Sequence, residues 1–250
     1  MKIFIWIVGV LALLVVGFMA LNTSDYKNIS GPVQVIPITH ATMVLHWGET
    51  VIYTDPTGGV KAFEEQFPAD IVVITDIHGD HLSTSTLTEV LGDAILVVPE
   101  AVKNLLPENL ASRAIVLGNG ETTTQQGLRI TAIPMYNLPE SPDNRHAKGR
   151  GNGYLFERDS FRVYVAGDTA GIPEMRTLKN IDMAFIPMNL PFTMGVEEAA
   201  SAVLDFKPKQ VYPFHYRGQD GLADIEKFKE LVNAGNSNIE VINKDWYPEQ

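Results

Sequence analysis

Residues 71–81 read Ile-Val-Val-Ile-Thr-Asp-Ile-His-Gly-Asp-His. The continuous run from Ile71 to Thr75 predicts a buried strand, and the polar residues after it predict the loop where that strand ends. Within six positions this loop carries four side chains that can bind a metal, namely Asp76, His78, Asp80 and His81. Imidazole and carboxylate together suit zinc or a similar divalent ion, and ligands this closely spaced can hold two ions. Asp and Gly also form ordinary turns, but a turn requires neither histidine.

The composition limits the classes of function. The chain has 250 residues, and a hydrophobic content of 45% is enough for a sizeable core. A net charge of −11 argues against a nucleic-acid partner, which would need a basic face. Cysteine is absent, so disulfides and thiolate ligands are excluded. Any metal must therefore be held by His, Asp, Glu or backbone oxygen.

The amino-terminal segment differs from the rest of the chain. After Lys2, the stretch from Ile3 to Leu21 is uncharged and apolar over 19 residues, about the length that spans a bilayer as a helix. It predicts a membrane anchor over residues 1–21, with a cleaved signal segment as the alternative. Either places the rest of the chain on the periplasmic or extracytoplasmic side, if Lys2 stays inside. Residues 22–31 are polar and turn-rich, which is typical of a linker.

Residues 32–250 are of a length typical of one domain. In each half, strand-like segments are followed by strands that alternate with helical stretches. In the first half the strands are expected over residues 33–38, 42–47, 51–54, 71–75 and 94–98, and the helices over 85–91 and 101–106. In the second half the strands are expected over residues 128–134, 153–157, 162–166, 181–186, 210–213 and 239–242, and the helices over 196–206 and 224–232. This pattern predicts an α+β fold in which two β-sheets pack face to face with helices outside.

Three residues later in the chain extend the first cluster. Asp168 and His215 each follow a predicted strand directly, and His146 lies in the polar loop of residues 137–152. A single Asp or His in such a place is ordinarily a turn or surface residue. In this order behind the first cluster, the three predict further metal ligands, provided that their loops open on the same edge of the sheets.

At this point the chain resembles the metallo-β-lactamase superfamily. That family has a His-x-His-x-Asp-His motif after a strand, then a further His, a bridging Asp and a last His. The resemblance covers essentially everything after residue 32. It is nearest to the ascorbate-phosphate-lactonase-like (MBL-fold metallo-hydrolase) group, through Thr39-His40-Ala41, Asp55-Pro56 and Gly167-Asp168-Thr169. It implies a four-layer αβ/βα sandwich with metals in a cleft at one edge of the two sheets.

The resemblance also implies a hydrolase with two metal ions, most simply Zn²⁺. One ion is assigned to Asp76, His78 and His146, the other to Asp80, His81 and His215, with Asp168 between them. Asp80 is expected to be catalytic as well, by orienting the nucleophile and moving its proton. Two ions about 3.5–4 Å apart lower the pKa of bound water from ~15.7 to ~7, which makes hydroxide available at neutral pH.

Two departures from the family pattern stand out. Asp76 occupies the position of the family's first His, and a carboxylate there adds negative charge and favours a harder metal such as Mn²⁺ or Fe. An ungapped comparison places Asn137 where the family has its next His. His146, nine residues on, is the alternative ligand, and in that case the glycine-rich loop around it must fold over the cleft.

The substrate is expected to be a small molecule, and four residues are candidates to contact it: His40, Asn137, Lys148 and Arg150. His40 is alternatively a structural imidazole. Lys148 and Arg150 could meet an anionic group, or their glycine-rich surroundings simply form tight turns. A lactone or other carboxylic ester is the first expectation. A phosphodiester, including that of a lipid, is the alternative, as is a non-catalytic protein that binds a metal or ligand on the same fold.

Overall fold

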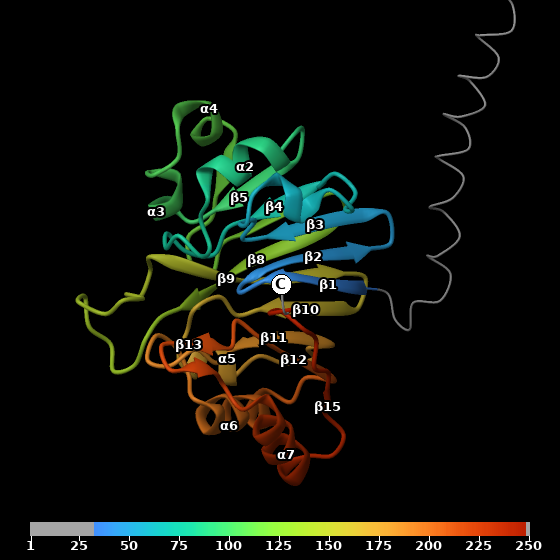
Figure 1. Ribbon diagram of the computed structural model, residues 1–250, viewed down its shortest axis with the longest axis vertical. Helices are drawn as coiled ribbons and strands as arrows, with labels where there is room; N and C mark the ends of the chain where they lie inside the picture. Colours follow the sequence, from blue (N-terminus) through green and yellow to red (C-terminus); the bar gives the residue numbers. More distant parts are fainter. Residues whose placement is uncertain (1–32, 249–250) are drawn as a thin grey trace, which may run out of the picture. The chain divides into compact units, whose positions relative to one another are not determined.

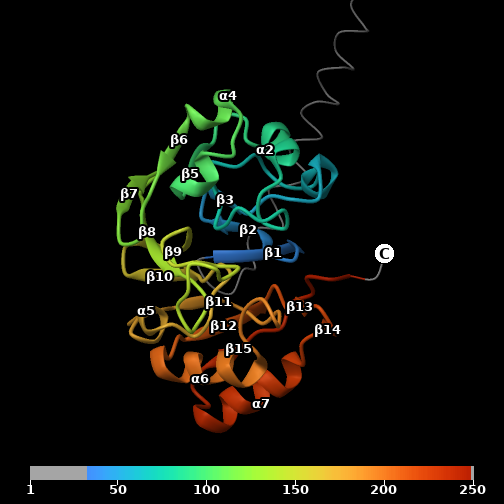
Figure 2. The ribbon, with the colours of Figure 1, turned by 90° about the vertical axis from the view of Figure 1, so that its left-hand side faces the viewer.

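The computed structural model describes residues 33–248, and nearly all of them belong to one compact unit, Val35–Gln250. Two mixed β-sheets lie face to face, with helices on the outer side of each, as Figures 1 and 2 show. This arrangement confirms the predicted α+β sandwich of four layers.

The first sheet has six strands in the order β1-β2-β3-β4-β5-β6. Their bounds are Val33–Thr39, Thr42–Trp47, Thr50–Thr54, Ile71–Val73, Ile95–Val98 and Ala114–Val116. β2 and β3 are antiparallel, whereas β3, β4, β5 and β6 are parallel neighbours. The helices that cover this sheet are α2 (Thr84–Val90), α3 (Glu100–Lys103) and α4 (Glu108–Ala111). A short 3-10 helix, η2 (Val60–Phe63), connects β3 to β4.

The second sheet has seven strands in the order β15-β12-β11-β10-β9-β8-β7. In chain order their bounds are Thr122–Gln125, Leu128–Met135, Gly151–Arg158, Phe161–Val165, Met183–Pro187, Gln210–Phe214 and, for β15, Glu240–Val241. β7 to β10 form an antiparallel meander, and β10, β11, β12 and β15 are parallel. Below this sheet lie α5 (Pro173–Arg176), α6 (Val196–Phe206) and α7 (Ile225–Gly235) (Figure 2). A small hairpin of β13 (Arg217–Gly218) and β14 (Gly221–Leu222) follows β12.

The two sheets are joined directly beneath the end of β4. The hydroxyl of Tyr154 donates to the Ile74 carbonyl at 2.8 Å, and the Asn152 amide donates to the Thr75 carbonyl at 2.9 Å. This close approach needs glycine in β9, because a Cβ on Gly151 would lie 2.8 Å from the Thr75 carbonyl oxygen. The expectation that the glycines of residues 149–153 simply form tight turns is therefore wrong for Gly151 and for Gly153, which lies in the same strand.

The element boundaries follow the predicted pattern with a few differences. α6 has the predicted bounds, with Gly195 as its N-cap, and α2 begins after Ser83, whose side chain accepts from the Thr86 amide. β6 and β7 were not expected. Both lie at sheet edges, and the sequence of β7, Thr-Thr-Thr-Gln, has no apolar residue to indicate a strand.

The predicted localisation needs a correction. No helix within residues 33–248 has the length and apolar content needed to cross a membrane. The described residues thus contain no helical membrane anchor, and the expected membrane-anchored, periplasmic or extracytoplasmic localisation has no support in them. The anchor and the linker expected over residues 1–21 and 22–31 lie outside the described residues.

Candidate metal centre

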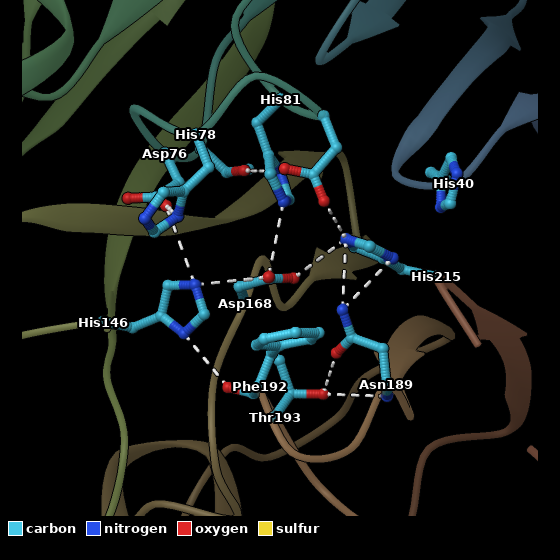
Figure 3. Close-up of polar contacts among 12 residues, drawn as sticks. His40, Asp76, His78, His81, His146, Asp168, Asn189, Phe192, Thr193 and His215 are labelled. Carbon is cyan, nitrogen blue, oxygen red and sulfur yellow. Dashed lines mark hydrogen bonds and ion pairs between the residues drawn. The ribbon is translucent and has the colours of Figure 1, made fainter. Parts of the chain in front are cut away.

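Seven side chains from four separate parts of the sequence meet at one end of the two sheets. Two groups have ligand atoms that all lie within 4.8 Å of one another; they are Asp76, His78 and His146, and Asp80, His81 and His215. Asp168 lies between the groups (Figure 3). Its Oδ2 is 3.3 Å from Nε2 of His146 and 3.4 Å from Nε2 of His81, and its Oδ1 is 3.5 Å from Nε2 of His215. The structure therefore brings together all seven residues that the sequence predicted as ligands.

Each side chain comes from a loop at the carboxyl end of a strand or from the connection between β8 and β9. The first four follow β4, Asp168 follows β10, and His215 follows β12. β4 is fully buried and hydrogen-bonded on both sides, so its end is a rigid support. Asp55 and His215 have φ angles of 45° and 46°, in the left-handed region that a residue other than glycine rarely adopts. Such backbone conformations persist where the surrounding structure imposes them, and they cluster at functional sites.

The chemistry of the cluster fits metal ions. Nε2 of His81, Nε2 of His146 and Oδ1 of Asp168 are buried and have no hydrogen-bond partner. A buried polar atom left without a partner costs about 1–3 kcal/mol, and here several such atoms face one another. Imidazole nitrogens and carboxylate oxygens are the ligands that divalent transition metals take. The residues present would therefore accommodate two cations, one for each group.

Asp55 fixes the orientation of His81. Nδ1 of His81 lies 2.8 Å from Oδ2 of Asp55 and 2.9 Å from the hydroxyl of Thr75. Thr75 itself donates to Asp55 through its amide at 2.7 Å and its hydroxyl at 2.6 Å, so the carboxylate is held as an acceptor. Nδ1 of His81 is then the nitrogen that carries the proton, and Nε2 faces Asp168. Carboxylate partners of this kind are typical of ligating histidines.

The connection between β8 and β9 places His146 rather than Asn137 in the cluster. Nδ1 of His146 lies 3.1 Å from the Phe192 carbonyl, which accepts its proton and leaves Nε2 facing Asp76 and Asp168. The Asn137 side chain accepts from the His146 amide at 2.9 Å and donates to the Phe192 carbonyl at 2.8 Å. Asn137 thus ties the loop down instead of reaching the cluster.

His215 has a support of its own in the loop after β11. The side-chain nitrogen of Asn189 lies 3.4 Å from both ring nitrogens of His215 (Figure 3). Thr193 holds Asn189 in turn, because its hydroxyl contacts Oδ1 of Asn189 and accepts from the Asn189 amide at 3.1 Å. Nε2 of His215 lies 3.3 Å from Oδ2 of Asp80.

Asp76, the carboxylate at the first position of the motif, is fully buried among polar neighbours, with Nε2 of His146 at 3.8 Å from its Oδ2. It contacts Nδ1 of His78, and Nη2 of Arg150 lies 3.3 Å from its Oδ1. Burial alone would raise the pKa of Asp76. The His78 hydrogen bond and the charges of His81, His78 and Arg150 outweigh burial and hold this pKa below its usual value.

The same balance governs the other charged groups. Burial would raise the pKa of Asp168, but the charges of His215 and His81 hold it well below its usual range. Burial would likewise raise the pKa of Asp80, and the His215 hydrogen bond and the His81 charge lower it. Burial would lower the pKa of His81, and the carboxylates of Asp168 and Asp55 raise it well above 6.5. The site is thus arranged to hold positive charge in its centre.

The substrate candidates lie in different places. His40 is next to His215, with ring centroids 5.5 Å apart, and its Nδ1 lies 3.2 Å from the Tyr247 hydroxyl. Lys148 is paired with Glu140 at 2.9 Å and Glu174 at 3.3 Å, and it lies over the Tyr136 ring. Arg150 pairs with Asp76, and Asn137 holds the loop. Of the four candidates, His40 is therefore the one whose ring packs against a histidine of the cluster, and its backbone carbonyl also accepts from the His215 amide at 3.3 Å.

Four residues important to the site were not predicted from the sequence: Asp55, Asn189, Phe192 and Tyr247. Asp55 was noted only as part of a turn shared with the family. Its place at the end of β3, next to the parallel strand β4, is the one signal that could have indicated a role. Phe192 acts through its carbonyl, which no sequence pattern reveals.

The fold and this cluster define a metallo-hydrolase of the metallo-β-lactamase kind. A protein family described as "Beta-lactamase superfamily domain" has a sequence model that matches residues 34–215. The chain therefore belongs to the β-lactamase superfamily, and it is a metal-dependent hydrolase. It is 34% identical over 194 residues to a UPF0173 metal-dependent hydrolase of Thermococcus onnurineus, covering 74% of this chain and 86% of the relative. A second UPF0173 hydrolase, from Pyrococcus abyssi, is 31% identical over 210 residues, with 80% and 92% covered.

Solved structures show the same fold. A protein of Parabacteroides distasonis designated a metal-dependent hydrolase has 36% identity and a TM-score of 0.74, covering 85% of this chain and 92% of its own. Igni18, a metallo hydrolase of Ignicoccus hospitalis, has 23% identity and a TM-score of 0.71, with 85% and 95% covered. At that identity, the likeness to Igni18 concerns the fold alone.

Proposed function

We propose that the cluster binds two divalent cations and hydrolyses an uncharged carboxylic ester, most simply a lactone. The observation that carries this proposal is the position of Asp168, whose two oxygens face histidines of both three-residue groups. Asp76, His78 and His146 would hold one ion, and Asp80, His81 and His215 the other. Zn²⁺ suits the four imidazoles, and the carboxylate of Asp76 also admits Mn²⁺ or Fe.

Two such ions supply Lewis acidity and bring the pKa of water close to neutrality. Asp80 then has a second task, because its side chain is 39% exposed whereas those of Asp76 and Asp168 are buried. Its lowered pKa keeps it a carboxylate at neutral pH. Asp80 can therefore accept a hydrogen bond from water, orient that water and pass its proton to the oxygen that leaves as the ester bond breaks.

The distribution of charge favours an uncharged substrate. Three carboxylates belong to the cluster, and the two cations expected to meet an anionic group, Lys148 and Arg150, are both paired with carboxylates. A phosphodiester would therefore find neither of these cations free and would depend on the bound ions alone to offset its charge, whereas an ester or lactone brings no charge. The charges thus support a carboxylic ester over a phosphodiester.

A cavity of about 380 Å³ lies beside the loop that follows β11, and we expect it to take the part of the substrate away from the ester bond. Its lining includes the apolar side chains of Met188, Leu190, Met194 and Leu222 and the charged side chains of Glu197, Asp220, Asp224 and Lys227. Met188 donates its amide to the His215 carbonyl at 3.4 Å, so the wall of the cavity is connected to the cluster. Its apolar side chains suit a hydrocarbon portion of the ester.

His40 would bind the substrate carbonyl. The Tyr247 hydroxyl accepts from the Arg217 amide at 3.1 Å, which leaves its proton for Nδ1 of His40 at 3.2 Å. Nδ1 of His40 is then an acceptor and Nε2 carries the hydrogen. Burial also lowers the pKa of His40, so the ring is neutral and donates from Nε2. A donor of this kind would stabilise negative charge that develops on the carbonyl oxygen.

The test is to prepare metal-free protein, reload it with Zn²⁺, Mn²⁺ or Fe²⁺, and measure ions per chain and turnover. The substrates are a panel of lactones, open-chain esters and phosphodiesters. We expect two ions per chain and at least tenfold faster hydrolysis of the best lactone or ester than of any phosphodiester. Asp80→Asn should lower kcat by about 100-fold or more, and the exposed loop variant Asp143→Asn should leave it unchanged. Two bound ions without turnover would instead indicate a ligand-binding protein, and faster phosphodiester cleavage would refute the uncharged substrate.

A further inference from the structure

Arg150 is the one lysine or arginine within residues 33–248 that forms an ion pair with a carboxylate of the cluster. Its Nη2 lies 3.3 Å from Oδ1 and 3.4 Å from Oδ2 of Asp76. Asp76 is fully buried, and the Arg150 side chain is 23% exposed. The guanidinium is therefore close to both carboxylate oxygens in a place where water screens the pair only weakly.

The position of this guanidinium is fixed from a second side. Nη2 of Arg150 also donates to the Arg145 carbonyl, and the Arg150 amide donates to the Ala147 carbonyl at 3.2 Å. Arg145, Ala147 and Arg150 belong to the same loop that carries His146 into the cluster. One short segment thus provides both a ligand of the first group and a cation beside that group.

The charges of the cluster show what this cation does. When bound ions keep the imidazoles neutral, the three carboxylates Asp76, Asp80 and Asp168 give the ligands a net charge of minus three, and the guanidinium of Arg150 reduces it to minus two. The reduction falls on the first group, because Arg150 contacts Asp76 and has no ion pair with Asp80 or Asp168. An ion held by Asp76, His78 and His146 therefore meets a carboxylate whose charge is already largely offset.

We propose that Arg150 weakens, and so adjusts, the affinity of the first group for its metal ion. This inference rests on the proposed metal site. Arg150 competes with the ion for the Asp76 carboxylate and repels it as a like charge. The first group therefore binds its ion less tightly than the full negative charge of Asp76 would allow. With Arg150 in place, the ion receives less negative charge from Asp76 and is a stronger Lewis acid than it would be without Arg150.

The alternative role for Arg150 is mechanical, and it predicts the opposite sign. If Arg150 served only to hold Asp76 and the His146 loop in place, its removal would disturb two ligands and weaken metal binding. If Arg150 acts through its charge, removal strengthens binding even though the loop loses a hydrogen bond. The direction of the change in affinity therefore separates the two roles.

The experiment uses the full chain in a His215→Ala background, which removes one imidazole from the second group and leaves the first group intact. Metal-free protein is titrated with Co²⁺ alone, and the visible absorption of the bound ion reports occupancy and coordination. Arg150→Met, which removes the charge, should bind Co²⁺ roughly tenfold more tightly or better than its parent, as expected for one unit charge removed near a divalent ion. Arg150→Lys, which keeps the charge, should stay within about threefold.

Equal or weaker binding by Arg150→Met would overturn the inference and leave Arg150 a support for the loop. Should that variant fail to fold, as judged by circular dichroism, Arg150→Gln provides the same test, because its amide can still donate to the Arg145 carbonyl. Absence of Co²⁺ binding in the parent would overturn the proposed metal site itself. Binding in the parent that Arg150→Met or Arg150→Gln does not strengthen would overturn only the role of Arg150.

Discussion

Oδ2 of Asp55 lies 2.8 Å from Nδ1 of His81, although 26 positions separate the two residues in the sequence. β3 and β4 are parallel neighbours, so the loops at their carboxyl ends meet at one edge of the first sheet. The contact decides which nitrogen of His81 carries a proton, and so which one is available to a metal ion.

Asp55→Asn should disable this arrangement. The Thr75 amide requires an oxygen at the Oδ1 position, so the new amide nitrogen would face His81 and turn Nδ1 into an acceptor. Nε2 would then carry the hydrogen and could not bind a metal. We expect a 10- to 100-fold loss of affinity for one of the two ions, measured by competition with a chromophoric chelator.

Asp70→Asn is the matched control for this variant. Oδ2 of Asp70 accepts from the Val51 amide at 2.8 Å, at the opposite end of the same strands. This change should lower the melting temperature without changing metal affinity. Unaltered metal affinity in Asp55→Asn would show that Asp55 does not set the proton position of His81.

His146→Ala and Asn137→Ala should have different effects. His146→Ala removes a ligand and should leave one tightly bound ion per chain. Asn137→Ala removes only two side-chain hydrogen bonds, one accepted from the His146 amide and one donated to the Phe192 carbonyl. Both ions should therefore still bind, with the first weakened by about thirtyfold, since each lost bond costs about 1 kcal/mol. Elemental analysis after gel filtration gives the stoichiometry. A larger loss of metal in Asn137→Ala than in His146→Ala would contradict the position of His146.

Tyr247→Phe should lower activity without changing metal content. Without the hydroxyl, Nδ1 of His40 loses its donor and the ring no longer has a fixed tautomer. We expect roughly a tenfold fall in kcat/KM on the preferred ester, the effect of one lost hydrogen bond, and a larger fall for His40→Ala. Tyr216→Phe is the control, because the Tyr216 hydroxyl contacts the Lys244 carbonyl at 3.3 Å. Equal activity of Tyr247→Phe and the wild-type protein would exclude the proposed role of His40.

Alkaline pH should destabilise the protein through Tyr53. Burial raises the pKa of this tyrosine to about 12, and its hydroxyl donates to the Phe67 carbonyl at 2.7 Å. Between pH 10 and 12 the unfolded chain loses the Tyr53 proton while the folded chain keeps it. The unfolded state then binds fewer protons, so the free energy of unfolding falls as pH rises, by up to about 1.4 kcal/mol per pH unit.

Urea unfolding of the wild-type protein at pH 9 to 12 measures this slope. In Tyr53→Phe the free energy of unfolding should fall less steeply with pH, because one buried tyrosine no longer contributes. At pH 8 the two proteins should differ in free energy of unfolding only by the lost hydrogen bond to the Phe67 carbonyl. An identical slope in both proteins would assign the alkaline loss of stability to other groups, such as Tyr212, whose pKa burial also raises to about 12.

The sequence predicts six of the seven residues of the cluster from local patterns, and it leaves the choice between His146 and Asn137 open. A strand of apolar residues that ends in Asp76-Ile77-His78-Gly79-Asp80-His81 marks both the element and the place of the ligands. The strands before Asp168 and His215 do the same. Likewise, α6 has clear helical periodicity and was predicted with its observed bounds.

The supporting contacts could not be predicted in this way, because they arise only when the sheets pack. The carbonyl of Phe192 meets His146 across 46 positions, and the Tyr247 hydroxyl meets His40 across 207. A carbonyl is present at every residue, so no sequence pattern distinguishes the one that binds His146. The edge strand β7 was missed for a different reason, since its polar, half-exposed residues lack the apolar alternation of a strand.

The two halves of the chain each hold an incomplete share of the cluster. Asp76, His78, Asp80 and His81 precede β7, whereas His146, Asp168 and His215 follow it. A polypeptide divided between Val116 and Thr122 would thus yield two fragments, neither of which retains a complete three-residue group. Fragment complementation should then be cation-dependent: chelator would keep the pieces apart, and added Zn²⁺ would promote their reassociation.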